Sequence, residues 1–355
     1  MTRPARYQWM TGETTWGSGS RACTFVVSTL LIGCRYQRAF VDFFEDQLVA
    51  KKYDWKALLR EFMFEGDQPL INGLVSGRKY ERIHFECWTD KAPVAHPLIH
   101  LGYAYELNSR TVAIEALALS ACFYGSLHKY IDDPKYARPS PVQATSLLDI
   151  LAKVREDKRF DGLYKKRSGD ISKVLGEQED VFLEYFNAWE LSDPRKQFEE
   201  SQQVAVAILA GTDAAEDSRF DFFFVHVLTS SHAVRLLLPC IPATFHISLV
   251  RQWWLFTLAV YIAQTRPEIK LGRITDYDVQ GRDWKFVLDT ALRSSHSMDA
   301  HFVKALRSIK VASETWGDGD GFYLKAAVQV ADEFERWGGF ETSEDDVAHA
   351  YPELQ

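Results

Sequence analysis

Residues 96–127 read HPLIHLGYAYELNSRTVAIEALALSACFYGSL, and their periodicity is the strongest indication of how the chain folds. Large apolar residues recur here at spacings of three and four, the period of one face of an α-helix. The stretch is also rich in Ala and Leu, which have high helix propensity. The apolar positions are Leu98, Leu101, Tyr105, Ile114, Leu117 and Ala121. This pattern predicts a buried helix, or two helices divided near Asn108.

The helical period continues on both sides of this stretch. From Ala39 the apolar residues again recur at three- and four-residue steps, which predicts two amphipathic helices. Further helices are predicted at about 142–156, 177–191, 196–210, 220–237, 246–264, 282–309 and 322–337. Alternating β-branched strands bounded by tight turns do not occur, so a parallel nucleotide-binding sheet has little material. We therefore predict an all-α protein.

Three segments depart from the helical pattern. Residues 1–38 contain glycines that break any period, and we predict an irregular segment there. Residues 77–95 carry a mixed Lys, Arg, Trp and Pro content that indicates an inserted loop. An acidic tail follows at 341–355. The expected organisation is a single large multi-helix domain over residues 39–340.

Composition limits the possible partners. The chain has 355 residues, a net charge of -8 and 14% aromatic residues, so it is globular and lacks a broad basic surface for nucleic acid. The apolar run at 22–34 is too short to span a bilayer, and the run at 253–263 is flanked by polar residues and predicts a buried helix. We expect no membrane partner and a cytoplasmic protein. The sequence does not specify an oligomeric state.

Ten histidines are present, and three local groups of them can carry chemistry. In the first, Pro97 fits the start of a helix, which places His96 near the N-cap and His100 about one turn further on. Their side chains then share one edge of the helix, an arrangement that suits two metal ligands or one ligand and a supporting group. A capping histidine and a core histidine are the structural alternative.

The second group is FFFVHVLTSSHAVR at 222–235, where polar residues interrupt an apolar helix. His226 and His232 are six residues apart, roughly 240° around a regular helix, so they face one point only if the helix is irregular. Burying two imidazoles, three hydroxyls and the Arg235 guanidinium unpaired among apolar residues would cost several kcal/mol. Both a polar site and a purely structural role remain open here.

The third group is His301 with Lys304, three residues apart on one helix face. Desolvation disfavours the ammonium form of a lysine buried beside histidines, and the neutral amine can act near a metal or react with carbon dioxide to give an anionic ligand. The alternative is an exposed lysine on an amphipathic helix.

The common motifs for dinucleotides, nucleotide phosphates, serine hydrolysis and zinc proteolysis do not occur, and no flavin site is visible. What remains is a helical protein whose histidines project from several helix ends into an aromatic-rich interior. Such a bundle can hold one metal or one flat aromatic substrate. We therefore predict a histidine-lined interior cavity.

At these same residues the sequence resembles the questin oxidase-like family of fungal secondary-metabolite oxidoreductases, which includes the aflatoxin-pathway Baeyer-Villiger-type oxidase. The resemblance extends from about Phe40 to Trp337, and its blocks are residues 96–106, 115–118, 224–239 and 299–304. It implies an oxidoreductase, a monooxygenase or ring-cleaving dioxygenase. Such an enzyme would act with dioxygen on a polycyclic polyketide quinone such as an anthraquinone or xanthone.

The resemblance also implies cofactors and site residues. A ring-cleaving relative is described with mononuclear non-haem iron held by histidines and a carboxylated lysine, and NADPH is often described as required. The matching positions here are His96, His100, His226, His232 and Lys304 as metal ligands, with His301 in support. His232 and Arg235 are the expected catalytic groups. An iron centre suits this chemistry because triplet oxygen reacts slowly with closed-shell organic molecules.

Two alternatives stay open. One enzyme of the same class would use no metal and rely on NADPH and on activation of the substrate. The other is a non-catalytic helical binding protein derived from such an enzyme. It is suggested because family members usually begin with a histidine-containing block, whereas residues 1–38 contain no histidine.

Overall fold

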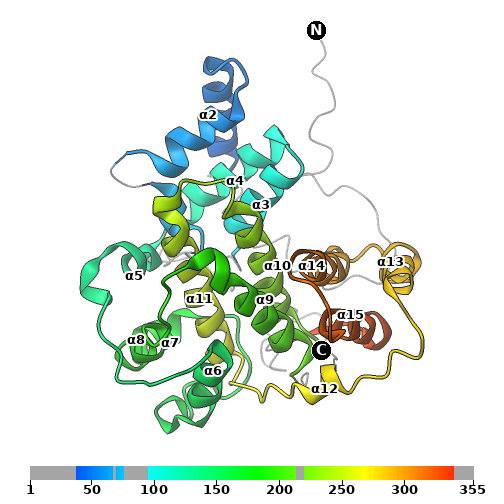
Figure 1. The fold of residues 1–355 in the computed structure, drawn as a ribbon. Coiled ribbons are helices and arrows are strands. Elements are labelled where there is room, and N and C mark those ends of the chain that lie inside the picture. Colours follow the sequence, from blue (N-terminus) through cyan, green and yellow to red (C-terminus); the bar gives the residue numbers. More distant parts are fainter. Residues whose placement is uncertain (1–36, 67–68, 76–94, 213–219, 340–355) are drawn as a thin grey trace, which may run out of the picture.

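The computed structural model describes residues 37–66, 69–75, 95–212 and 220–339 (Figure 1). Helices dominate these residues, as the sequence predicts. Residues 37–50 are helical, and α2 (Trp55–Leu59) continues into a π-helical turn at Arg60–Phe64. The other helices are α3 (His96–Glu106), α4 (Arg110–Phe123), α5 (Lys129–Asp132), α6 (Leu147–Glu156), α7 (Ser172–Glu177), α8 (Glu179–Phe186), α9 (Pro194–Ala210), α10 (Phe222–Leu237), α11 (His246–Ala263), α12 (Gly272–Thr275), α13 (Trp284–Arg293), α14 (Ala300–Trp316) and α15 (Phe322–Glu333).

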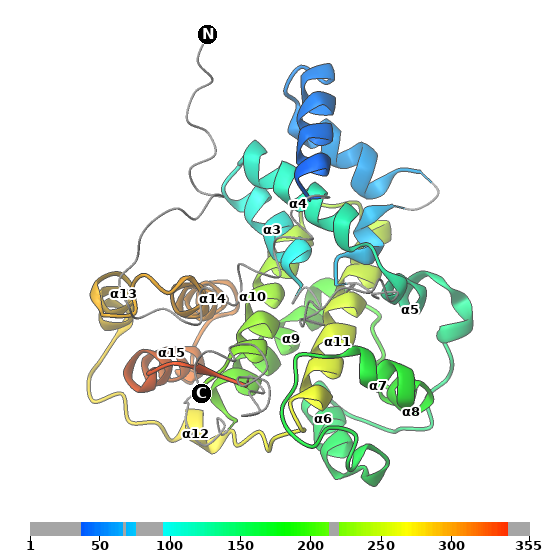
Figure 2. The ribbon, with the colours of Figure 1, turned by 180° about the vertical axis from the view of Figure 1, so that it is seen from behind.

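Helices α10 and α11 form the middle of the domain. Both are apolar around most of their circumference, and α11 buries Trp253 and Trp254 completely. A helix that is apolar on all sides is stable only when other helices surround it. Helix α10 contacts α3, α9, α11 and α14. Figure 2 shows α13, α14 and α15 on one side of this centre and α6, α7 and α8 on the other.

The stretch 96–127 forms two packed helices, α3 and α4, and the predicted division near Asn108 is confirmed. Asn108 adopts a left-handed conformation with φ of 47°, and the Ser109 hydroxyl caps α4 by accepting a hydrogen bond from the Val112 amide. Helix α3 also packs closely on α10. A Cβ atom at Gly102 would lie 2.6 Å from the Ala233 Cβ, so this approach requires glycine.

Within the described part of the chain, the strands are limited to the two-residue segments β1 (Phe220–Asp221) and β2 (Trp337–Gly338), which pair in parallel. Strand β1 leads directly into α10, and the Asp221 side chain caps this helix by accepting hydrogen bonds from the amides of Phe223 and Phe224. The pairing therefore fixes the start of α10 against the segment that carries Trp337.

One predicted helix was wrong. The segment 282–309 is divided between α13 and α14, because the polar residues 294–297 form turns and Asp299 caps a new helix. Other predictions lie mainly outside the described residues: the irregular segment 1–38 apart from residues 37 and 38, the inserted loop 77–95 apart from Ala95, and the tail 341–355. No described helix is both long enough and apolar enough to span a membrane.

Candidate metal centre

Three histidines from three helices meet inside the domain. His96 begins α3, His226 lies in the second turn of α10, and His301 is the second residue of α14. One ring nitrogen from each lies within 4.8 Å of the other two. The His226 ring centroid is 5.2 Å from that of His96 and 4.9 Å from that of His301. We call these three residues the histidine triad.

The orientation of His226 is fixed by its own helix. Its Nδ1 donates a hydrogen bond to the Phe222 carbonyl oxygen at 2.7 Å. The proton therefore sits on Nδ1, and Nε2 carries a lone pair. Nε2 is buried and has no hydrogen-bond partner among the described residues. Metal-binding histidines are commonly held in this way, with one ring nitrogen donating to a carbonyl and the other left for the metal.

His96 and His100 take different positions. Ala95 has a left-handed conformation before α3, and Pro97 lies in the first turn, so His96 is placed at the helix start beside His226. One turn later, His100 Nδ1 lies 2.9 Å from the His96 carbonyl oxygen and donates to it. The His100 ring centroid is 6.1 Å from that of His96, and His100 is not part of the triad. It stands next to the triad and not within it.

Asp299 and two aromatic side chains hold the third member. The Asp299 carboxylate caps α14 by accepting from the amides of His301 and Phe302, and it accepts a further hydrogen bond from the Trp337 indole at 2.8 Å. The Phe222 ring centroid lies 4.7 Å from that of His301 and 4.6 Å from that of His226. The Phe222 ring therefore packs against two of the three histidines of the triad.

Burial keeps the triad uncharged at neutral pH. It lowers the pKa of His96 to about 3, with further contributions from His100 and Lys304. Burial and the Lys304 charge lower the pKa of His301 to about 4, and burial holds the pKa of His226 well below its usual value. The pKa of Lys304 is itself lowered by burial. Neutral imidazoles have free lone pairs, which is the form that binds metals.

The triad lies close enough to hold one metal ion after a modest adjustment. Three nitrogens bonded to one ion at about 2.1 Å lie roughly 3.0–3.6 Å apart. The three ring nitrogens lie within 4.8 Å of one another, so side-chain rotations that draw them together by up to about 1–2 Å are needed. The lone pair on His226 Nε2 would supply one of these bonds.

His232 and Arg235 lie elsewhere. Helix α10 is unbroken between His226 and His232, so the irregularity needed to bring both to one point is absent, and the two side chains are separated by about 9 Å along the axis. His232 Nε2 lies 3.5 Å from Glu106 Oε2 without the alignment of a hydrogen bond. Arg307 donates to both oxygens of Glu106 at 2.7 and 2.8 Å. We call Glu106, His232, Arg235 and Arg307 the arginine cluster.

Comparison with known proteins identifies the family of this chain. The family model described as questin oxidase-like matches residues 27–309. The chain belongs to the questin oxidase-like family. A Baeyer-Villiger oxidase of Pestalotiopsis fici is 24% identical over 294 residues, which is 78% of this chain and 61% of that protein.

Two further relatives match this questin oxidase-like chain at a similar level of identity. A Baeyer-Villiger oxidase of Aspergillus sp. (strain MF297-2) is 26% identical over 309 residues, 81% of this chain and 68% of that protein. The questin oxidase of Aspergillus fumigatus is 24% identical over 239 residues, 62% of this chain and 52% of that protein. The chain thus spans roughly half to two thirds of the length of these relatives.

Some residues around the sites of this questin oxidase-like protein were not singled out from the sequence. His301 was expected only in support but is a member of the triad. Glu106 and Arg307 were overlooked, although Glu106 ends the first block of the family resemblance. Phe222 directly follows the cap of α10. It lies four residues before His226, and this spacing in the sequence indicates that the two side chains share one helix face.

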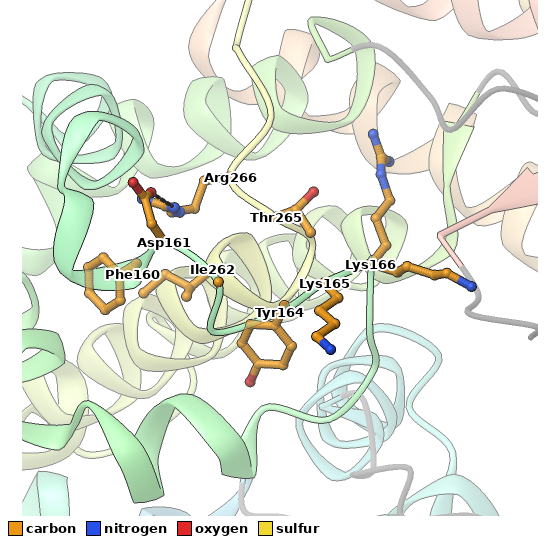
Figure 3. Close-up of a pocket in the computed structure, with 10 residues that line it drawn as sticks. Phe160, Asp161, Tyr164, Lys165, Lys166, Ile262, Thr265 and Arg266 are labelled. Carbon is orange, nitrogen blue, oxygen red and sulfur yellow. Dashed lines mark hydrogen bonds and ion pairs between the residues drawn. The ribbon is translucent and has the colours of Figure 1, made fainter.

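A cavity of about 430 Å³ lies away from all the predicted site residues. Figure 3 shows it between the loop at 160–167 and the end of α11, with Lys165 and Lys166 on the loop and Arg266 paired with Asp161. Arg167, also on this loop, forms an ion pair with Asp221 at 3.1 Å. The cavity is therefore linked to the start of α10 but does not include the histidine triad.

Proposed function

We propose that this chain is a metal-dependent oxidoreductase that uses dioxygen to oxidise a polycyclic aromatic ketone or quinone. The observation that carries the proposal is the histidine triad, in which three neutral imidazoles from three helices converge around the unpaired Nε2 of His226. A buried polar atom without a partner is costly unless a ligand satisfies it. The family membership and the names of the relatives support the same class of reaction.

The proposed metal is non-haem iron, with His96, His226 and His301 as its ligands. We propose that His100 and Lys304 support this ligand set from beside it, since the charges of both lower the pKa of His96. An iron ion with open positions would supply the activation of dioxygen that closed-shell organic molecules lack. His226 is buried and His96 and His301 are partly buried, which would limit the access of water.

The side chains around the triad suit a flat substrate. Phe222 and Trp337 offer aromatic surfaces next to His301, with ring centroids 4.7 and 6.3 Å away. Aromatic rings pack favourably on one another in offset or edge-to-face arrangements. We propose that these two residues orient an anthraquinone-like or xanthone-like polyketide so that its carbonyl group faces the triad.

The electrons balance in one of two ways. In a Baeyer-Villiger oxidation, one oxygen atom enters the bond between the carbonyl carbon and a neighbouring carbon. The other oxygen atom leaves as water, with two electrons from a reductant such as NADPH. In ring cleavage by a dioxygenase, both atoms enter the product and no reductant is consumed. Two of the relatives are named Baeyer-Villiger oxidases, which favours the first reaction, and we propose that reaction here.

The test is oxygen consumption by purified protein supplied with ferrous iron and a hydroxyanthraquinone, with and without NADPH. We expect consumption that needs the quinone and NADPH, stops with a chelator and gives a product one oxygen atom heavier. His226→Ala should abolish it, whereas His128→Ala, which changes a partly exposed histidine paired with Asp132 and outside the triad, should not. Full activity in chelator would favour a metal-free enzyme, and no activity with any quinone would favour a binding protein.

A further inference from the structure

The arginine cluster carries an imbalance of charge. Arg235 and Arg307 are positive, and both oxygens of the nearest carboxylate, Glu106, are occupied by Arg307. Glu314, the first acidic residue after Arg307 on α14, is paired with Lys310. Burial lowers the pKa of Arg235, while the Glu106 charge partly opposes this. Among the described residues, the arginine cluster therefore contains two guanidinium groups and one carboxylate, and both oxygens of that carboxylate already accept hydrogen bonds from Arg307.

The unpaired atoms of Arg235 lie on one edge of its guanidinium group. Nε and Nη2 are both buried, and neither has a hydrogen-bond partner in the described part of the chain. These two nitrogens form the side of the fork that binds a carboxylate through two parallel hydrogen bonds. Leaving both donors unsatisfied is unfavourable, so the geometry calls for an acceptor with two oxygens.

His232 adds a second, independent indication of a ligand. Its side chain is 2% exposed, and neither ring nitrogen has a well-aligned partner among the residues described. It lies one turn before Arg235, on a neighbouring face of α10. The Arg307 side chain is 40% exposed, so the arginine cluster extends to the protein surface. The proposed site is thus largely buried, with one member at the surface.

We propose that Arg235 binds an oxyanion beside His232, with the Nε and Nη2 edge of Arg235 donating two hydrogen bonds to it. The expected ligand is a carboxylate carried by a small organic molecule, because its two coplanar oxygens match this edge. A phosphate group offers the same chemistry from another source. The site is separate from the histidine triad, and its occupancy does not depend on the proposed oxidation.

The test is a calorimetric titration of the metal-free 355-residue chain with benzoate and, separately, with inorganic phosphate. The wild-type protein should bind one benzoate per chain in a saturable manner. Arg235→Gln should weaken this binding by about tenfold or more, as expected when hydrogen bonds to a charged group are lost. Arg138→Gln, which removes an exposed arginine paired with Asp180, should leave it unchanged.

Two further comparisons make the result decisive. Arg235→Lys keeps the charge but removes the two-donor edge, so it should also bind benzoate more weakly, and it serves if Arg235→Gln does not fold. Tighter binding of phosphate than of benzoate would identify a phosphate-bearing ligand. Equal affinity in the wild type and both Arg235 variants, or no saturable binding of either anion by the wild type, would overturn the proposal. Because the protein is metal-free and nothing is oxidised, neither result depends on the proposed function.

Discussion

Replacing histidines of the triad should change how the stability of the protein depends on pH. The pKa is about 3 for His96 and about 4 for His301, whereas an unfolded histidine has a pKa of about 6.5. Since the folded pKa values are depressed, the unfolded chain binds more protons as the pH falls below 6.5. The stability that these groups contribute is therefore fully present above pH 6.5 and is lost as the pH falls toward 4.

The size of this effect follows from the same values. One pKa unit corresponds to about 1.36 kcal/mol, so moving from pH 8 to pH 5 destabilises the fold by at most about 2 kcal/mol for each of the two histidines. Asp221 acts in the opposite direction, because burial raises its pKa to about 6. It is present in every variant, so its contribution cancels when variants are compared.

The assay is urea unfolding at pH 8 and pH 5 in the presence of a chelator. The loss of unfolding free energy between these two pH values should be about 2–4 kcal/mol smaller in the double variant His96→Gln, His301→Gln than in the wild type. Phe222→Leu is the matched control, because it disturbs the same site without removing an ionisable group. An equal loss in the wild type and the double variant would refute the argument that burial keeps these imidazoles neutral.

Other predictions concern the helices that position the triad. Gly102→Leu should destabilise the protein by about 1–3 kcal/mol in urea unfolding, because a side chain there collides with Ala233. The control is Gly176→Ala, which should be neutral or slightly stabilising, because a Cβ atom at this position meets nothing within 4 Å. Similar midpoints for these two variants would contradict the close packing of α3 on α10. Asp299→Ala should cost about 1 kcal/mol through loss of the α14 cap and should weaken metal binding, whereas Asp299→Asn should retain most of the stability. Unchanged stability in Asp299→Ala would argue against this cap.

Much of the helical fold could be predicted from local patterns. The division at Asn108 was visible because the apolar period is interrupted there and Ser109 can cap a new helix. The failure at 282–309 has a local cause too, since Asp299 also fits an N-cap position and was not used. Periodicity alone does not show where one helix ends when polar residues such as those at 294–297 are compatible with an exposed helix face.

The composition of the site was harder to predict because it depends on which helices pack together. The sequence places His226 and His232 about 240° apart on a regular helix, and the unbroken α10 keeps them apart. His301 joins His226 only because α14 packs against α10. Glu106 and Arg307 are 201 residues apart, and no local pattern connects them.

The most direct test of the histidine triad is the iron content of the protein after equilibrium dialysis against ferrous iron under anaerobic conditions. We predict one tightly bound iron per chain in the wild type and in His128→Ala, and almost none in His226→Ala or His301→Ala, with circular dichroism confirming that each variant is folded. Iron bound equally by the wild type and both triad variants would contradict the claim that these histidines form a metal site.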